Sequence, residues 1–191
     1  MIKISKSNYV TGIKCPNALW FKKYRKDIEP DKNQAILDAG TAVGELACDR
    51  FPGGVRITAK PWEPEAIDQT KKAIAQNASY IYEATFCTDT DEYCAVDILQ
   101  NNNDGTWDII EVKSNPEPHE YHYLDVSFQR YVLTLCGIKV RNCFVMTLNK
   151  EYIRHALKPV KEFIFKHMPC FMHKRSFNEI VTLCNALPFR P

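Results

Sequence analysis

The chain has 191 residues, of which 45% are hydrophobic and 25% are charged, and its formal net charge at pH 7 is +2. This balance is ordinary for a globular protein and excludes a low-complexity disordered chain. The sequence shows neither a signal peptide nor an apolar run of membrane-spanning length, so we expect a cytoplasmic protein with no membrane partner. No repeat or linker divides it, which predicts a single domain over residues 1–191.

The small net charge conceals a strong segregation of charge along the chain. Residues 1–26 contain seven basic residues and no acidic one, residues 27–149 contain ten basic and twenty acidic residues, and residues 150–191 contain eight basic and three acidic residues. Solvated helix faces would account for each cluster, and a polyanionic partner would account for basic ends around an acidic centre. We distinguish a basic helical N-terminal segment (1–30), a core (31–150) and a basic helical C-terminal tail (151–191).

Helices are expected in the first third of the chain. Ser5 is a favourable N-cap, and Pro16 suits the first position of a second short helix. Apolar residues recur at helical spacing over residues 31–51, and the following Pro52-Gly53-Gly54 would end that longer helix.

The centre of the chain predicts a β-sheet. The expected elements are a strand at 55–59, a helix at 63–77, strands at 80–87, 93–99 and 106–113, a helix at 119–136 and a strand at 140–148. A hairpin turn at 101–105 would join two of the strands. This order indicates an α/β (α+β) fold with a central mixed β-sheet flanked by helices.

Charged residues interrupt two of the predicted strands. Glu111 and Lys113 share one face of the stretch WDIIEVKS, and Asp97 interrupts the apolar stretch CAVDIL. Hairpin pairing can bring Asp97 near Glu111, and two such carboxylates need a cation, for which oxygen ligands favour Mg²⁺ or Mn²⁺. Lys113 would then lie beside the ion. The alternative is a structural Asp97 and an exposed Glu111–Lys113 ion pair.

Four stretches of sequence, taken in order, carry a family resemblance. Asp97, followed after thirteen residues by Glu111-Val112-Lys113, resembles the core motif of the PD-(D/E)XK nuclease superfamily. The stretches SKSNYVTGIKCPNALWFKKY, GTAVGELA and LDVSFQRYVL resemble segments of its RecB-like branch, which includes CRISPR-associated exonucleases. The resemblance implies a restriction-endonuclease-like core. It also implies a metal-dependent deoxyribonuclease, an exonuclease of DNA processing, repair or defence.

The resemblance also implies a role for each matching residue. The implied catalytic residues are Asp97, Glu111, Lys113 and Gln129. The implied ligands of Mg²⁺ or Mn²⁺ are Glu45, Asp97, Glu111 and the carbonyl of Val112. Gly44 stands where the branch often has histidine, so Glu45 would supply the acidic helix's contribution. The alternative function is a nuclease-fold module that binds nucleic acid and cuts poorly as part of a larger assembly.

The basic N-terminal segment supplies candidate contacts to DNA, either single-stranded or at a duplex end. These candidates are Lys14, Lys22, Lys23 and Arg25, together with Tyr131, which is out of register with the tyrosine of the related motif. Three aromatic residues, Trp20, Phe21 and Tyr24, are interleaved with the basic ones. We expect these aromatics in the core of an amphipathic helix; stacking on a single strand is the alternative.

Cysteine spacing bears on a second cofactor. In relatives, the cysteine of the Cys-Pro signature joins three downstream cysteines around a [4Fe–4S] cluster. Here Cys15 is in place, but beyond residue 150 only Cys170 and Cys184 follow, which argues against a cluster unless Cys136 or Cys143 contributes. Most thiols are expected to be free and buried. A thiol-based or metal-sensing regulator is a further alternative that rests on the cysteines alone.

Overall fold

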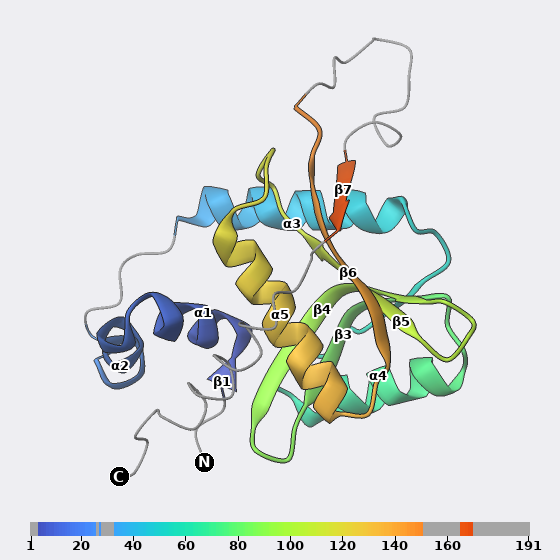
Figure 1. The fold of residues 1–191 in the computed structure, drawn as a ribbon, viewed down its shortest axis with the longest axis horizontal. Coiled ribbons are helices and arrows are strands. Elements are labelled where there is room, and N and C mark those ends of the chain that lie inside the picture. The colour runs from blue at the N-terminus through green and yellow to red at the C-terminus, as the bar shows by residue number, and fades with distance from the viewer. Residues whose placement is uncertain (1–3, 26, 28–32, 151–164, 170–191) are drawn as a thin grey trace.

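The structure is a computed structural model and describes residues 4–25, 27, 33–150 and 165–169. Its elements are β1 (Ile4–Ser5), α1 (Lys6–Lys14), α2 (Pro16–Tyr24), α3 (Gln34–Asp49), β2 (Val55–Arg56), α4 (Pro64–Ala75), β3 (Tyr80–Cys87), β4 (Glu92–Asn101), β5 (Trp107–Val112), α5 (Glu120–Leu135), β6 (Val140–Leu148) and β7 (Phe165–Pro169). One sheet runs in the order β2-β3-β4-β5-β6-β7, with β1 paired to β4. Parallel and antiparallel pairs both occur, so the predicted mixed sheet is confirmed (Figure 1).

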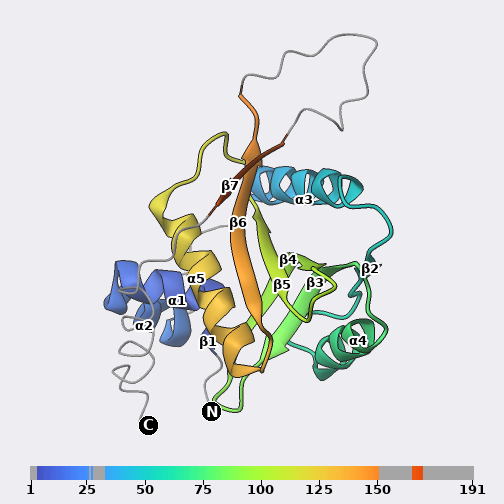
Figure 2. The ribbon, with the colours of Figure 1, turned by 45° about the vertical axis from the view of Figure 1, so that its right-hand side comes forward.

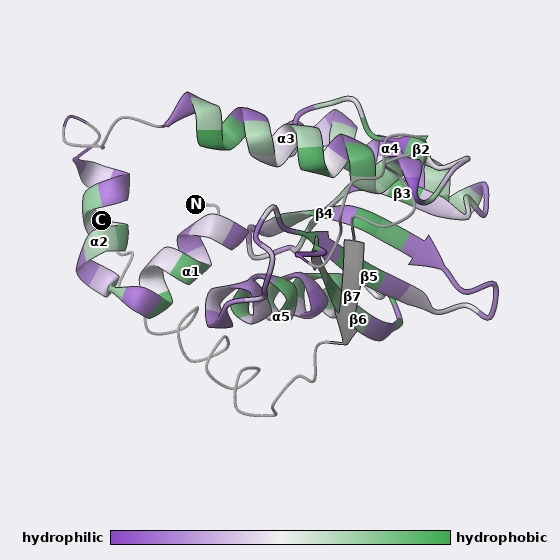
Figure 3. Cartoon of the chain, turned by 90° about the horizontal axis from the view of Figure 1, so that it is seen from above, coloured by the Kyte–Doolittle hydropathy of each residue, from purple (hydrophilic) through white to green (hydrophobic). Residues whose placement is uncertain are grey.

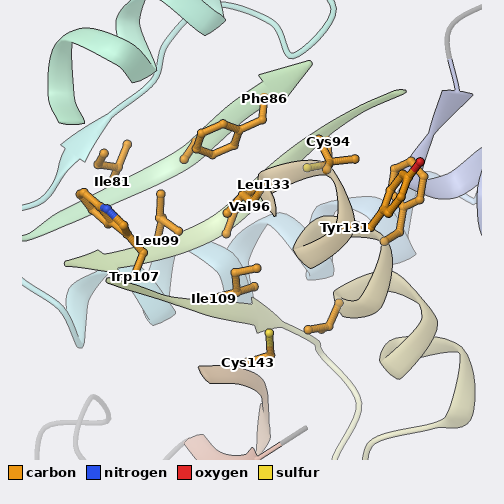
Figure 4. Packing of buried hydrophobic residues seen from close by; sticks show 14 of the residues in the cluster. Ile81, Phe86, Cys94, Val96, Leu99, Trp107, Ile109, Tyr131, Leu133 and Cys143 are labelled. Atoms are coloured by element: carbon orange, nitrogen blue, oxygen red, sulfur yellow. The ribbon is translucent and has the colours of Figure 1, made fainter. Parts of the chain in front are cut away.

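Helices α3 and α5 lie on opposite sides of the sheet (Figures 2 and 3). On the α5 side, the larger core cluster joins Val96 and Ile109 of the strands to Leu133 of the helix (Figure 4). On the α3 side, Ala47 packs against Ile98 and the rest of a smaller cluster. Among the described helices, none is both long and apolar enough to cross a bilayer.

Local signals in the sequence account for several helix ends. The Ser5 side chain accepts a hydrogen bond from the Asn8 backbone N–H at the start of α1, and Pro16 occupies the first turn of α2. Gly137 follows α5 with φ +80°, a conformation that costs glycine little. The Ile138 N–H then donates to the Leu133 carbonyl and closes the helix end.

The N-terminal segment is built into the core of the fold. Strand β1 runs parallel to β4, with Ile4 opposite Glu92 and Ser5 opposite Tyr93. Tyr9 of α1 is 1% exposed, and its ring stacks on Phe128 of α5 with 5.0 Å between ring centroids. Residues 4–14 are therefore anchored to both the sheet and α5.

The prediction of a helical C-terminal tail is wrong for residues 165–169, the part of the tail beyond residue 150 that the structure describes. Residues 165–169 form strand β7, which pairs antiparallel with β6 and places Phe165 opposite Leu148. The edge of β6 offers unpaired backbone groups, and hydrogen bonding to that edge outweighs the local preference of the segment. The remainder of the predicted tail lies outside the described residues.

We expect His122 to make the protein sensitive to acid. Its side chain is 1% exposed, and its Nδ1 accepts a hydrogen bond from the His119 N–H at 3.0 Å. Burial, followed by the nearby Lys113 ammonium, lowers the pKa of His122 to about 4. The unfolded chain, with a histidine pKa of about 6.5, then binds the proton more readily than the folded protein does. The contribution of His122 to stability should therefore decline as the pH falls through the interval between these two values.

Urea unfolding of the wild type and of His122→Gln measures this effect. Between about pH 7 and pH 4, the wild type should lose about 2–3 kcal/mol more of its free energy of unfolding than the variant loses. The variant starts from a lower stability at neutral pH because it lacks the ring. Parallel pH profiles for the two proteins would contradict the assignment.

Candidate active site

Asp97 and Glu111 lie where strands β4 and β5 part from one another. The ladder between the strands includes the pair Ile98↔Ile110 and does not extend to the next residues. There the Val112 backbone N–H donates instead to Oδ2 of Asp97, at 2.7 Å. A partly open cavity of about 320 Å³ lies at this point. It is lined by Gly40, Thr41, Gly44, Glu45, Cys48, Arg56, Glu83, Asp97, Ile98, Glu111, Val112 and Lys113.

The carboxylate of Glu111 is the most heavily compensated charge in the site. Glu111 as a whole is 1% exposed. Lys6 Nζ lies 2.8 Å from Oε1 and 3.0 Å from Oε2, and Lys113 Nζ lies 2.7 Å from Oε1. The Gln129 amide donates to Oε2. Burial by itself would raise the pKa of Glu111, but the Lys6 and Lys113 ammonium groups together hold that pKa well below its usual range.

The pKa of Asp97 is shifted in the opposite direction to that of Glu111. Burial is the main cause that raises the pKa of Asp97, to about 7, and the neighbouring Glu111 carboxylate adds to the effect. Lys6 and the Val112 N–H oppose it without cancelling it. A negative charge on Asp97 is therefore unfavourable in the metal-free protein, and a cation bound beside this carboxylate would stabilise the protein.

Glu83 adds a further acid to the same cavity. It lies on β3 between the pairs Tyr82↔Ile98 and Ala84↔Val96, and therefore opposite Asp97. Its φ is +60°, a left-handed conformation that is uncommon for a residue other than glycine. Burial raises the pKa of Glu83. A strained backbone and a half-buried charge at the same residue are typical of functional positions.

Helix α5 supports the site from the side of the larger core. Asp125 forms an ion pair with Lys113, with 2.5 Å between Oδ2 and Nζ. Gln129 lies one turn further along the same helix and is fully buried. Its Oε1 has no hydrogen-bond partner, so one polar atom beside Glu111 remains unsatisfied.

The structure places Glu45 at the cavity but not beside the other two predicted acidic ligands. Its side chain is 61% exposed and forms an ion pair with Arg56, with 2.8 Å between the charged atoms. Within the described part of the chain, no three His, Cys, Asp or Glu side chains are grouped as a ready metal site. The acidic pair and the Val112 backbone thus lie together, whereas Glu45 lies at the margin.

The predicted nucleic-acid contacts divide into exposed and buried residues. Trp20, Phe21 and Tyr24 are 50%, 45% and 50% exposed, so the expectation that they belong to the core is wrong. Leu19 is the residue of α2 that faces inward. Tyr131 is 8% exposed and lies in the larger core cluster, which contradicts its predicted contact with nucleic acid. The Tyr131 ring, on α5, packs in the core because removal of its apolar surface from water stabilises the fold.

The basic candidates all lie on the two N-terminal helices or directly after them. Lys14 places its ammonium 4.3 Å from the centroid of the Tyr121 ring, and Lys22 lies 3.5 Å from the Ser7 hydroxyl. Lys23 is half-buried, and burial lowers the pKa of its side chain. Arg25 forms an ion pair with Asp27 at 2.7 Å.

The cysteines that the structure describes are thiols and form no disulfide. Cys94 and Cys143 are buried, Cys48, Cys87 and Cys136 are half-buried, and Cys15 is exposed. Cys143 belongs to the larger core cluster, and the Cys136 thiol contacts the Cys87 carbonyl. Cys170 and Cys184, the other candidate cluster ligands, lie outside the described residues.

Sequence reasoning missed Lys6 and Glu83 as contributors to the site and assigned no role to Asp125. Lys6 reaches Glu111 across 105 residues, and no local pattern indicates that contact. Glu83 interrupts the apolar stretch YIYEATFC just as Asp97 interrupts its own strand, so the same signal could have identified it. Asp125 lies one helical turn before Gln129, and its shared face with that residue was the available signal.

Comparisons with known proteins identify the fold. No protein-family model and no curated protein matches the sequence. Among solved structures, the alkaline exonuclease LHK-Exo from Laribacter hongkongensis aligns with a TM-score of 0.58 at 12% identity, over 97% of this chain and 85% of that chain. The same exonuclease in complex with dAMP aligns with a TM-score of 0.55, again at 12% identity and with the same coverage. The chain therefore has the fold of an alkaline exonuclease.

We expect Asp97 to lower the stability of the metal-free protein at alkaline pH. Because folding raises the pKa of this carboxyl group, the contribution of Asp97 to stability should fall as the pH rises from about 4 to about 7, opposite in sign to the contribution of His122, and the full cost persists above that interval. Asp97→Asn keeps an oxygen that can accept the Val112 N–H. At about pH 8 in EDTA, the variant should unfold with a free energy about 1–3 kcal/mol higher than the wild type.

Asp108→Asn is the matched control for this measurement. Asp108 is also buried on a strand, but it accepts hydrogen bonds from the Asn142 N–H at 3.0 Å and from the Asn102 amide at 2.9 Å. The Arg141 guanidinium also lies 3.5 Å from Oδ2 of Asp108, so loss of the charge that faces these donors should destabilise the protein. Chemical denaturation with and without Mn²⁺ checks both signs, since Mn²⁺ should stabilise the wild type more than Asp97→Asn. A destabilised Asp97→Asn at about pH 8 would overturn the assignment.

Proposed function

We propose that this protein is a RecB-like, Mg²⁺- or Mn²⁺-dependent deoxyribonuclease that hydrolyses phosphodiester bonds as an exonuclease. One observation carries the proposal: Asp97, Glu111 and Lys113 line a single cavity in a chain with an alkaline exonuclease fold. The combination of two carboxylates from neighbouring strands and an adjacent ammonium suits an ion, a water and an anionic phosphate in one place.

The residues present fit a hard divalent cation. Asp97, Glu111 and the Val112 carbonyl would hold the ion, and all three residues line the cavity. Burial, together with the neighbouring Glu111 carboxylate, raises the pKa of Asp97, and the Lys6 ammonium offsets only part of that effect. When bound, such an ion lowers the pKa of a coordinated water and neutralises charge on the scissile phosphate.

The protein's own side chains would position the reactants. Lys113, held between Glu111 and Asp125, would direct its ammonium toward the attacking water and the developing phosphate charge. Asp125 would keep that ammonium in place, and Gln129 would orient Glu111. The roles of Asp125 and Gln129 are thus those of positioning residues.

Helix α2 would contact the DNA outside the cavity. Trp20 lies 5.2 Å from Phe21 and 5.4 Å from Tyr24, measured between ring centroids, and all three rings are about half exposed beside Lys22 and Lys23. Exposed rings among basic residues suit base stacking and phosphate contact along a single strand. In the solved complex with dAMP, the similar exonuclease holds a deoxynucleotide, which supports DNA as the substrate.

Cleavage of labelled DNA tests the catalytic proposal. With Mg²⁺ or Mn²⁺, the wild type should degrade DNA, and EDTA should abolish the reaction. Asp97→Ala and Lys113→Ala should each lower the rate by about a hundredfold or more. The first change removes a ligand of the ion, and the second removes the ammonium that would face the attacking water and the phosphate. Lys72→Ala, an exposed lysine on α4, should leave the rate unchanged.

The same assay separates the alternative function. The ion pair between Glu45 and Arg56 favours a nucleic-acid-binding module that cuts poorly, because it leaves the site short of one predicted acidic ligand. Tight DNA binding by the wild type without metal-dependent cleavage would support that module and refute the hydrolase.

Fluorescence titration with oligo-dT tests the α2 surface. Trp20→Ala should weaken binding about tenfold, since stacking on one base contributes about 1–3 kcal/mol. Lys22→Ala should instead reduce the dependence of affinity on salt. Trp62→Ala removes another exposed indole, 60% exposed, from the segment before α4 and should have no effect. Equal losses in Trp20→Ala and Trp62→Ala would contradict a specific role for α2.

A further inference from the structure

Lys6 makes the most direct charge contact in the site that the proposed mechanism does not use. Its Nζ is 2.8 Å and 3.0 Å from the two oxygens of Glu111, so the ammonium spans the whole carboxylate. The Glu111 side chain is 2% exposed and the Lys6 side chain is 23% exposed. A contact at this depth is not the solvated surface pair that contributes little to a protein.

The topology of the sheet brings Lys6 to this position. Strand β3 pairs with β4 along one edge from Gln100 to Tyr93, so β1 and β5 must share the other edge. On that edge β5 pairs with residues 98–101 and β1 pairs with residues 92–93, which leaves residues 94–97 between them. Lys6 directly follows β1 and therefore enters the gap that contains Asp97.

Two further contacts hold Lys6 in place. The Ser5 side chain caps α1, in which Lys6 is the first residue, by accepting the Asn8 N–H. Tyr9, on the same helix, stacks on Phe128 of α5. The Tyr9–Phe128 contact lies in the larger core cluster and the Ser5 cap fixes the start of the same helix, so the position of Lys6 is a property of the fold.

Lys6 and a divalent cation would compete for the same oxygen atoms. Each Glu111 oxygen lies within hydrogen-bond distance of Lys6, and a cation bound to either oxygen would face the ammonium at close range, where like charges repel strongly. Lys113 has Asp125 as a second carboxylate partner, whereas the hydrogen bonds of Lys6 within the described structure go to Glu111. A cation can therefore displace Lys6 without breaking a second ion pair, which displacement of Lys113 would require.

We propose that Lys6 is a built-in placeholder for the divalent cation: it holds Glu111 in the metal-free protein, gives way when the ion binds, and thereby sets the affinity for the ion. This inference rests on the proposed function, because it assumes an ion at Glu111. The inference makes Lys6, in the N-terminal segment, a positioning residue for Glu111. It also explains how the charge of the buried Glu111 carboxylate is compensated before the ion binds.

Binding of Mn²⁺ to Lys6→Met, followed by electron paramagnetic resonance or calorimetry, tests the proposal. Methionine keeps much of the length of lysine and removes the charge, so Mn²⁺ should bind about tenfold more tightly than to the wild type. Lys6→Arg retains the charge and should stay near the wild-type affinity. Lys72→Met, an exposed lysine of α4 that does not line the cavity, is the matched control and should not change it. A purely structural role predicts the opposite sign, with weaker Mn²⁺ binding in Lys6→Met.

A measurement on the wild type does not depend on whether the variant folds. In a ¹⁵N-lysine sample, the ammonium resonance of Lys6 should move or broaden on titration with Mg²⁺, while that of Lys113 should keep the signature of its pair with Asp125. A Lys6 resonance that is unchanged at saturating Mg²⁺ would overturn the placeholder role.

The outcomes also separate this inference from the proposed function. If the wild type binds Mn²⁺ and cleaves DNA, but Lys6→Met binds Mn²⁺ equally or more weakly, the placeholder role alone fails. If the wild type neither binds Mn²⁺ nor cleaves DNA, both proposals fail together.

Discussion

The compensation of the Glu111 charge is the constraint on which the site depends. A carboxylate with 1% exposure would be very costly to the folded state if it stood alone. The protein meets that cost with two ammonium groups and one amide, drawn from α1, from the end of β5 and from α5. Three parts of the chain must therefore be correctly placed for one acidic side chain to remain ionised in the interior.

The same constraint explains why the sheet is irregular at this point. Strands β4 and β5 separate after the pair Ile98↔Ile110, and the separation frees the Val112 N–H to bind Asp97. On the other side of β4, Glu83 takes a left-handed conformation opposite Asp97. A regular ladder would pair these backbone groups with one another and leave no cavity between the acids. The local loss of sheet structure is thus the condition for a polar site at the end of apolar strands.

Much of the fold could be predicted from the sequence because its signals are local. Alternation of apolar residues and the turn at residues 101–105 located β3, β4 and β5 to within a few residues, and helix periodicity located α3 and α5. Asp97 and Glu111 stood out because charges interrupted otherwise apolar strands, and the structure brings these two to one cavity. Their chemical roles remain predictions.

The remainder depends on contacts between distant residues. The pairing of Glu45 with Arg56 joins α3 to β2, and no sequence spacing determines that contact. The aromatic residues of α2 fit an inward-facing helix by pattern, but the helix packs through Leu19 and leaves them exposed. Strand β7 forms because the edge of β6 is available, which is a property of the finished sheet rather than of residues 165–169.

The pairing of β1 with β4 has a consequence for the order in which the protein matures during translation. Lys6 leaves the ribosome before Glu111, which is made 105 residues later and is followed by Gln129. Closing so long a loop is entropically unfavourable until the intervening strands and helices supply compensating contacts. A nascent chain, or one that has lost residues 4–6, therefore holds its acids without their full set of partners, and the finished arrangement arises only when these residues return to the completed sheet.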